Sequence, residues 1–208
     1  MATFGKLTNG ASESVNSADV ILVSKFTLPE DGLVSKLTVR HWVESTAQPA
    51  KGIMYADSAG APGAFKAVSV EVTVSATVEG EVDFSFSPAV SCVAADWWLG
   101  IFHNAAGTPG RVYVSRDNTA GQRQGVFATY PTYPDPFGTP TSLAGLLDVY
   151  ATYQPTFFAG GVLTPTGAGT FARVIKSALT GALTSAGAIT TVLNRAVSIA
   201  GAFSPAKN

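Results

Sequence analysis

Three stretches of the chain alternate apolar and polar residues with the period of two that is typical of β-strands. In residues 68–75, valine occupies every second position and serine, glutamate or threonine the others. Residues 81–86 read Glu-Val-Asp-Phe-Ser-Phe and alternate in the same way. In residues 36–44 the alternation places His41 among the apolar positions and Trp42 among the polar ones. Each stretch predicts a strand with one buried side and one solvent-facing side.

Further apolar runs at residues 20–28, 52–55, 96–102, 111–115 and 146–153 extend this pattern. Gly, Pro, Asn and Asp separate them, so about eight short strands follow one another with a turn every dozen residues or so. No helix of useful length is expected before residue 155. The pattern predicts an all-β domain, an antiparallel, jelly-roll-like β-sandwich, in a length of chain that can bury a sizeable core without a disulfide.

The charges divide the chain into two parts. Residues 1–153 hold nine basic and fourteen acidic residues, a net charge of −5, whereas residues 154–208 hold four basic residues and no acid. The join falls at Gln154-Pro155, where proline cannot donate a ladder hydrogen bond and so favours the end of a strand. We therefore expect a sandwich domain over residues 1–153 and a separate Gly/Ala/Thr-rich tail over residues 154–208.

The tail repeats itself. Gly161-Val-Leu-Thr returns as Gly181-Ala-Leu-Thr and begins again as Gly201-Ala-Phe-Ser, with the glycines twenty residues apart both times. A fixed period indicates a repeated unit that buries its face against neighbours, and fewer than three complete copies are present. The pattern suits short helices or strands equally. The tail is expected to anchor or oligomerise the protein; the candidate contact residues are Leu163, Leu183, Phe203, Arg173, Lys176 and Arg195.

Composition argues against several functions. A pI near 6.1 does not suit a nucleic-acid binder. The lone Cys92 cannot form an intramolecular disulfide or a cysteine zinc cluster, and only two histidines, His41 and His103, are present. The uncharged residues 177–194 are weakly apolar and interrupted by glycine, so membrane insertion is not expected. Residues 1–10 have no apolar core of a signal peptide, which favours synthesis in a cytoplasm that the protein leaves, if at all, by lysis or assembly.

The motifs of catalysis are also missing from the sequence. Residues 167–172 match the G-x-G-x-x-A dinucleotide pattern, but no acid follows for the ribose and the glycines belong to the tail repeat. No G-x-S-x-G elbow and no D-x-D-x-D-G calcium loop occurs. We therefore expect a protein that is not an enzyme and that needs no cofactor or metal.

Residues 55–63, Tyr-Ala-Asp-Ser-Ala-Gly-Ala-Pro-Gly, form the most specific local signal. Asp57 and Ser58 can bond nearby backbone N–H groups, and Pro62-Gly63 suits the centre of a type II turn. The stretch predicts a rigid corner between two strands, with an adhesive loop as the alternative.

Two groups of aromatic residues are candidate contacts for a glycan or a protein partner. The proline-rich residues 129–140 carry Tyr130, Tyr133 and Phe137 on a stiff segment. These rings can pack on their own sandwich, contact another subunit or stack on sugar rings. Trp97 and Trp98 are adjacent, so in a strand one faces inward and the other outward. The outward one, or Trp42, is a second candidate platform.

Two of these segments resemble a known module. Residues 53–63, Ile-Met-Tyr-Ala-Asp-Ser-Ala-Gly-Ala-Pro-Gly, and residues 95–101, Ala-Asp-Trp-Trp-Leu-Gly-Ile, resemble the "YADSGGAPG … DYWLGL" pattern of a β-sandwich module of tailed-phage virion and surface proteins. Residues 4–10 and 148–153 look like the first and last strands of that module. The tail repeats look like those appended to minor tail proteins and fibres. The resemblance implies no catalytic residue.

Together these features favour a bacteriophage virion structural protein: a capsid decoration protein, a head or tail fibre, or a minor tail protein. Such a protein would be made in the host bacterial cytoplasm. Its tail would dock either on sister copies, giving a homo-oligomer such as a trimer, or on a capsid or tail protein. The alternative is a carbohydrate-binding module for host surface polysaccharide.

Overall fold

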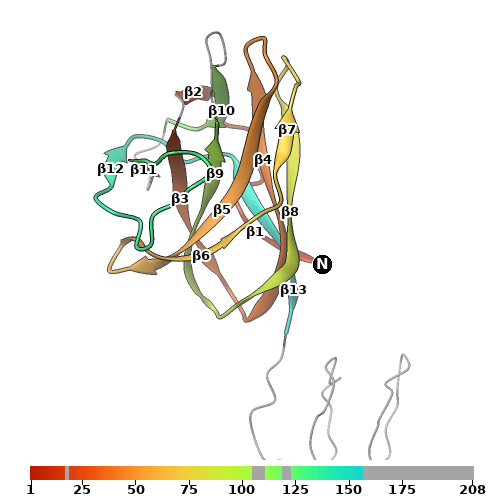
Figure 1. Cartoon of the computed structure of the whole chain (residues 1–208). Coiled ribbons are helices and arrows are strands. Elements are labelled where there is room, and N and C mark those ends of the chain that lie inside the picture. Colours follow the sequence, from red (N-terminus) through yellow and green to blue (C-terminus); the bar gives the residue numbers. More distant parts are fainter. Residues whose placement is uncertain (17–18, 105–110, 119–122, 157–208) are drawn as a thin grey trace, which may run out of the picture. The chain divides into compact units, whose positions relative to one another are not determined.

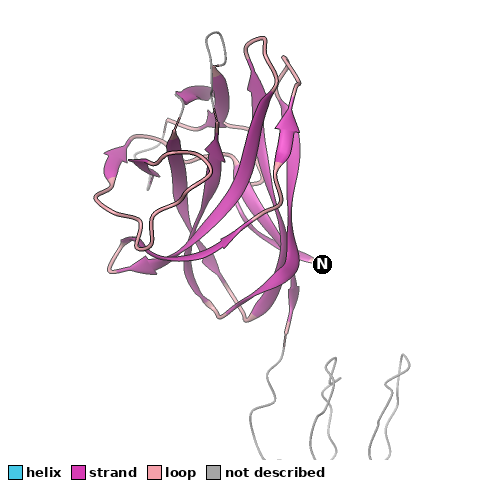
Figure 2. Cartoon of the chain, viewed as in Figure 1, coloured by secondary structure: helices cyan, strands magenta, loops and turns pink. Residues whose placement is uncertain are grey.

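The computed structural model describes residues 1–16, 19–104, 111–118 and 123–156. Residues 1–155 form one compact unit, which contains every described strand (Figure 1). None of the described residues is helical, and thirteen strands pack as two antiparallel sheets, which confirms the predicted β-sandwich (Figure 2). The tail residues that the sequence nominated for assembly, 163, 173, 176, 183, 195 and 203, lie outside the described residues.

Sheet A has the order β1-β13-β4-β10-β2, with β8 also paired to β4. Its strands are β1 (Ala2–Gly5), β2 (Ser12–Asn16), β4 (Gly32–Val43), β8 (Gly80–Cys92), β10 (Val112–Arg116) and β13 (Val149–Pro155). Strands β10 and β13 pair with successive parts of β4, on the edge opposite β8. Sheet A therefore forks where the end of β10 meets the start of β13.

Sheet B has the order β12-β11-β3-β9-β5-β6, with β7 also paired to β5. Its strands are β3 (Val20–Leu28), β5 (Gln48–Ser58), β6 (Ala61–Val68), β7 (Val72–Val74), β9 (Ala95–His103), β11 (Arg123–Phe127) and β12 (Thr141–Leu143). The segment between β11 and β12 runs toward the β5–β6 hairpin (Figure 1). We call residues 128–138 of this segment the strap.

The main core lies between the sheets, and the alternation in residues 36–44 predicts its contribution from β4 correctly. Leu37, Val39, His41 and Val43 are all fully buried there, and Trp42 lies on the other face. A second apolar cluster lies on the outer face of sheet B, beneath the strap. It comprises Ile21, Val23, Ile53, Tyr55, Trp98, Phe102 and Phe137. Sheet B is thus apolar on both faces, because each face is covered.

The prediction of one unbroken strand over residues 68–75 is wrong. Strand β6 ends at Val68, which pairs with Ile53 of β5, and β7 begins at Val72, which pairs with Ala50 of β5. Between these two pairs, residues 69–71 lie opposite only two residues of β5, 51 and 52. This bulge reverses the expected sides, since Ser69 is buried and Val70 is 51% exposed. Ser69 can be buried because its hydroxyl accepts a hydrogen bond from Gly52 N at 2.9 Å and donates one to Val70 O at 2.6 Å.

The predicted type II turn at Pro62-Gly63 is also wrong, although the predicted corner exists. Pro62 already pairs with Asp57 in the ladder, and the two-residue turn consists of Ala59 and Gly60. Both have positive φ, 52° and 87°, which is the conformation of a type I′ hairpin turn. That turn matches the right-handed twist of the strands better than a type II turn does.

Candidate functional site

The two segments that carry the phage resemblance are neighbours in sheet B. Residues 53–58 lie on β5 and residues 95–101 on β9, and the ladder pairs Tyr55 with Trp98 and Ala56 with Trp97. Asp57 joins them further, since its Oδ1 accepts the indole Nε1–H of Trp98 at 2.8 Å. Its Oδ2 accepts Gly60 N–H of the turn at 3.0 Å. The motif residues therefore stabilise a hairpin and its neighbouring strand.

The expectation that one of Trp97 and Trp98 faces outward as a platform is corrected by the structure. Trp97 is 6% exposed in the main core, and Trp98 is fully buried in the second cluster. The two rings do lie on opposite faces of β9, but the strap covers the face that the sequence left to solvent. Neither ring is available to a sugar in this structure.

The strap packs on its own sandwich, which is the first of the three alternatives for its aromatic residues. Phe137 is fully buried and meets the Tyr55 ring edge-to-face at 4.8 Å, so it is not a surface contact. Tyr133 stacks on Phe65 at 4.2 Å, and the Tyr130 hydroxyl donates to Glu71 Oε2 at 2.7 Å. Tyr130 and Tyr133 are half-buried.

Backbone and side-chain hydrogen bonds hold the strap at several points. The Tyr55 hydroxyl donates to Pro134 O at 3.0 Å, Phe65 N donates to Asp135 Oδ1 at 2.9 Å, and Phe137 N donates to Gly63 O at 2.9 Å. Burial, with Asp135 nearby, raises the pKa of Tyr55, so its hydroxyl stays protonated and able to donate.

Trp42 remains as a candidate surface contact, on the outer face of sheet A. Its ring stacks on Tyr113 of β10 with 5.3 Å between centroids and 9° between planes, and both residues are half-buried. Two positions along β4, Arg40 pairs with Glu81 at 2.6 Å. A planar aromatic surface beside charged hydrogen-bonding groups is a suitable contact for a sugar or for another protein.

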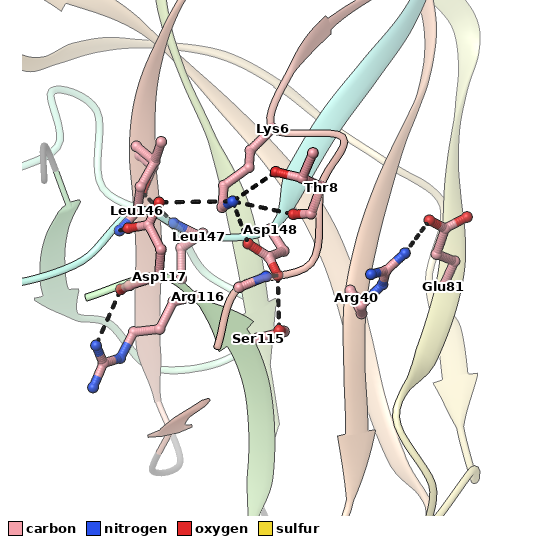
Figure 3. Close-up of polar contacts among 12 residues, drawn as sticks. Lys6, Thr8, Arg40, Glu81, Ser115, Arg116, Asp117, Leu146, Leu147 and Asp148 are labelled. Carbon is pink, nitrogen blue, oxygen red and sulfur yellow. Dashed lines mark hydrogen bonds and ion pairs between the residues drawn. The ribbon is translucent and has the colours of Figure 1, made fainter. Parts of the chain in front are cut away.

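A buried polar cluster, which sequence reasoning missed, occupies the fork of sheet A (Figure 3). Asp148 N donates to Ser115 O at 2.9 Å and Arg40 N donates to Asp148 O at 3.0 Å, so backbone bonds fix Asp148 between β4 and β10. Its carboxylate Oδ2 accepts Gly10 N–H at 2.5 Å and the Ser115 hydroxyl at 2.7 Å. The Asp148 side chain is 3% exposed.

Lys6 completes this cluster. Its Nζ lies 3.6 Å from Asp148 Oδ1 and 3.6 Å from Asp117 Oδ2, and it donates to the Thr8 carbonyl and hydroxyl oxygens at 3.1 and 3.0 Å. A small hollow beside the cluster is lined by Lys6, Leu7, Thr8, Arg40, Glu81, Asp148 and Tyr150. The cluster depends on pairing between residues far apart in sequence, and no local motif signals it.

Burial keeps three titratable core residues, His41, His103 and Cys92, uncharged at neutral pH. Burial lowers the pKa of His41 to about 4 and that of His103 to about 3, His41 contributing to the latter. His41 stacks on Phe84, and its Nε2 has no hydrogen-bond partner. Burial also raises the pKa of the Cys92 thiol to about 11, so it is not a thiolate nucleophile at neutral pH.

Among the described residues, no group of three or more His, Cys, Asp or Glu side chains is placed to hold a metal ion. That part of the chain also contains no helix long and apolar enough to span a membrane. No protein-family model, curated protein or solved structure matches the chain.

Proposed function

We propose that this chain is a non-enzymatic structural protein of a bacteriophage virion. Its sandwich would be the exposed body, and its repeat tail would dock on sister copies or on a capsid or tail protein. The observation that carries the proposal is the pairing of the two resembling segments on β5 and β9, joined by the Asp57–Trp98 hydrogen bond. Residues that resemble a phage module are here the residues that build the sandwich.

The packing of the body supports the same function. Both faces of sheet B are covered, the aromatic rings of the strap are engaged in packing, and the two histidines are buried neutral groups. A body of this kind is suited to being displayed rather than to turning over a substrate. The tail has four positive charges and no acid, which suits docking in an acidic groove, while its low charge content and small residues suit close packing of copies.

The test is incorporation. Tagged full-length chain and tagged residues 1–155 are each supplied to assembling particles of the encoding phage, and the purified particles are analysed by mass spectrometry. The proposal predicts full-length chain at a fixed copy number and no 1–155 in the particles. Absence of the full-length chain would overturn the virion assignment, whereas incorporation of 1–155 would overturn the role of the tail.

The Trp42–Tyr113 pair favours carbohydrate binding as a second candidate function. Trp97 and Trp98 are buried, so Trp42 is the tryptophan whose fluorescence should respond to a sugar. Titration with host surface polysaccharides should shift the emission of the wild type and not that of Trp42→Phe. An unchanged spectrum across the panel would count against this function.

A further inference from the structure

The fold brings a lysine of the first strand region against an aspartate of the last. Lys6 directly follows β1 and Asp148 directly precedes β13, and these two strands are antiparallel neighbours in sheet A. The backbone N–H of Lys6 donates to Val149 O at 2.9 Å, which fixes the two residues side by side. Their side chains meet inside the fork, with Asp117 as a third member (Figure 3).

The two oxygens of the Asp148 carboxylate have different surroundings. Oδ2 accepts the hydrogen bonds from Gly10 N–H and the Ser115 hydroxyl. Oδ1 is buried without a hydrogen-bond partner and lies 3.6 Å from Lys6 Nζ. A buried carboxylate oxygen left without a hydrogen bond is costly, and the lysine amine is the group placed against it.

We propose that Lys6 and Asp148 form an intramolecular amide (isopeptide) bond after the chain has folded. The Lys6 ammonium and the Asp148 carboxylate together give one neutral amide and one water. The Nζ–Cγ bond forms, the Cγ–Oδ1 bond breaks, and Oδ1 leaves as water with two protons that Nζ loses. No oxidant, metal or further reactant is needed.

Each neighbour has a role in this reaction. Asp117 Oδ2, 3.6 Å from Nζ, takes one proton from the ammonium and passes it to Oδ1, so that the neutral amine can attack Cγ of a protonated carboxyl. It then relays the second proton from Nζ to the Oδ1 hydroxyl, which leaves as water. Gly10 N–H and the Ser115 hydroxyl hold the negative charge that develops on Oδ2. The Thr8 oxygens orient the amine.

Burial favours the amide. The Lys6 and Asp148 side chains are 11% and 3% exposed, so their ion pair has already lost most of its hydration. Condensation replaces two poorly hydrated charges with a neutral group and releases water from a site that water reaches poorly. Gly10 permits this tight arrangement, since a Cβ there would lie 2.1 Å from the Arg116 backbone.

The bond would also serve the proposed function, although it does not rest on it. The tail continues directly from β13, so a pull on the tail loads β13 first. A covalent link from the start of β13 to the end of β1 would stop the two strands from separating. It would also close nearly the whole sandwich into one covalent loop, which restricts the unfolded chain.

Mass spectrometry tests the proposal on the purified full-length chain. The wild type should be lighter than its sequence by the mass of one water, and the Lys6→Arg variant should have its full sequence mass. A digest should contain one branched peptide that joins Lys6 to Asp148. Asp117→Asn keeps both reacting groups and should form the bond more slowly or not at all.

The internal control is the Lys36–Asp83 pair, whose charged atoms are 2.5 Å apart but whose side chains are 34% and 51% exposed, far more than those of Lys6 and Asp148. It should yield no branched peptide. Circular dichroism checks that the variants are folded, and the wild-type digest decides the question even if a variant is not. Unlinked Lys6 and Asp148 peptides from folded wild type, with full intact mass, would overturn the proposal.

Discussion

At the scale of the residue, Asp57 is the connection between the turn, β5 and β9. Its carboxylate accepts hydrogen bonds from Gly60 N and from the Trp98 indole, and Lys25 Nζ lies 3.9 Å from it. The Trp98 side chain is buried, so loss of its acceptor leaves a buried N–H unpaired. Asp57 thus fixes the position of the ring on which the second cluster packs.

Asp57→Ala should therefore lower the free energy of unfolding by about 1–3 kcal/mol, the cost of an unpaired buried donor. Asp96→Ala is the matched control, because Asp96 also pairs with Lys25 but accepts its hydrogen bond from the exposed Thr27 hydroxyl and not from a buried indole. Its cost should be about 0–1 kcal/mol. Urea denaturation measures both, and equal losses would contradict this role of Asp57.

The buried histidines predict a loss of stability in mild acid. The pKa of His41 is about 4 in the fold against 6.5 in the unfolded chain, so below pH 6.5 the unfolded chain binds a proton that the fold excludes. Stability is complete above pH 6.5 and falls as the pH drops toward 4, by roughly 3 kcal/mol for His41. His103 adds a decline of the same sign.

His41→Leu should keep most of the free energy of unfolding at pH 7. Between pH 6.5 and 4 this free energy should fall less steeply than in the wild type, because only the contribution of His103 to the decline remains. Urea denaturation at pH 7, 5.5 and 4.5 gives the comparison. The carboxylates of Asp83 and Asp96, whose pKa values are lowered by hydrogen bonds and nearby lysines, lose their contribution only at more acidic pH. A variant as acid-sensitive as the wild type would contradict the assignment to His41.

At the scale of the element, the strap explains why sheet B has buried aromatic rings on both faces, although one face was expected to be exposed to solvent. Phe137 is fully buried in contact with Tyr55, whereas Phe127, just outside the strap, is 80% exposed. Together with its hydrogen bonds to β5 and β6, the strap makes the outer face of sheet B a second core.

Phe137→Ala should lower the free energy of unfolding by about 3–5 kcal/mol, because it opens a cavity among the second cluster. Phe127→Ala removes the same side chain at an exposed position and should change stability by less than about 0.5 kcal/mol. Thermal or urea denaturation of the two variants compares them directly. A small effect at Phe137 would mean that the strap is not part of the core.

The local hydrophobic pattern predicts strands that have one buried and one exposed side. It fails where residues distant in sequence determine which side is buried. Residues 36–44 form the predicted strand because one side meets the core along its whole length. Residues 68–75 have an equally regular pattern, but a bulge opposite Gly52 exposes Val70. Strands β2, β11 and β12 have five residues or fewer, which is too short for an alternation to be distinctive.

The same limit applies to the candidate site. The resemblance named residues 53–63 and 95–101 but not their pairing on β5 and β9, whereas Trp42 was correctly placed on an outward face. The burial of Trp98 depends on a strap some thirty residues later in the chain. The Lys6–Asp117–Asp148 cluster joins the start, middle and end of the sandwich, so only the strand topology brings it together.

At the scale of the whole molecule, residues 1–155 form a compact unit with its own core, and the charge pattern changes at the same place in the chain. A body with its own core does not need the tail in order to fold. We therefore expect residues 1–155 to be folded and monomeric, with the far-ultraviolet circular dichroism of a β-protein.

The central claim is that residues 1–155 fold alone and that the tail joins copies of the chain. Light scattering after gel filtration, on the full-length chain and on residues 1–155, tests it most directly. The account predicts a defined oligomer for the full-length chain and a monomer for residues 1–155, both folded. The same number of protomers in the two species would contradict assembly of copies through the tail and would leave a capsid or tail protein as the tail's partner.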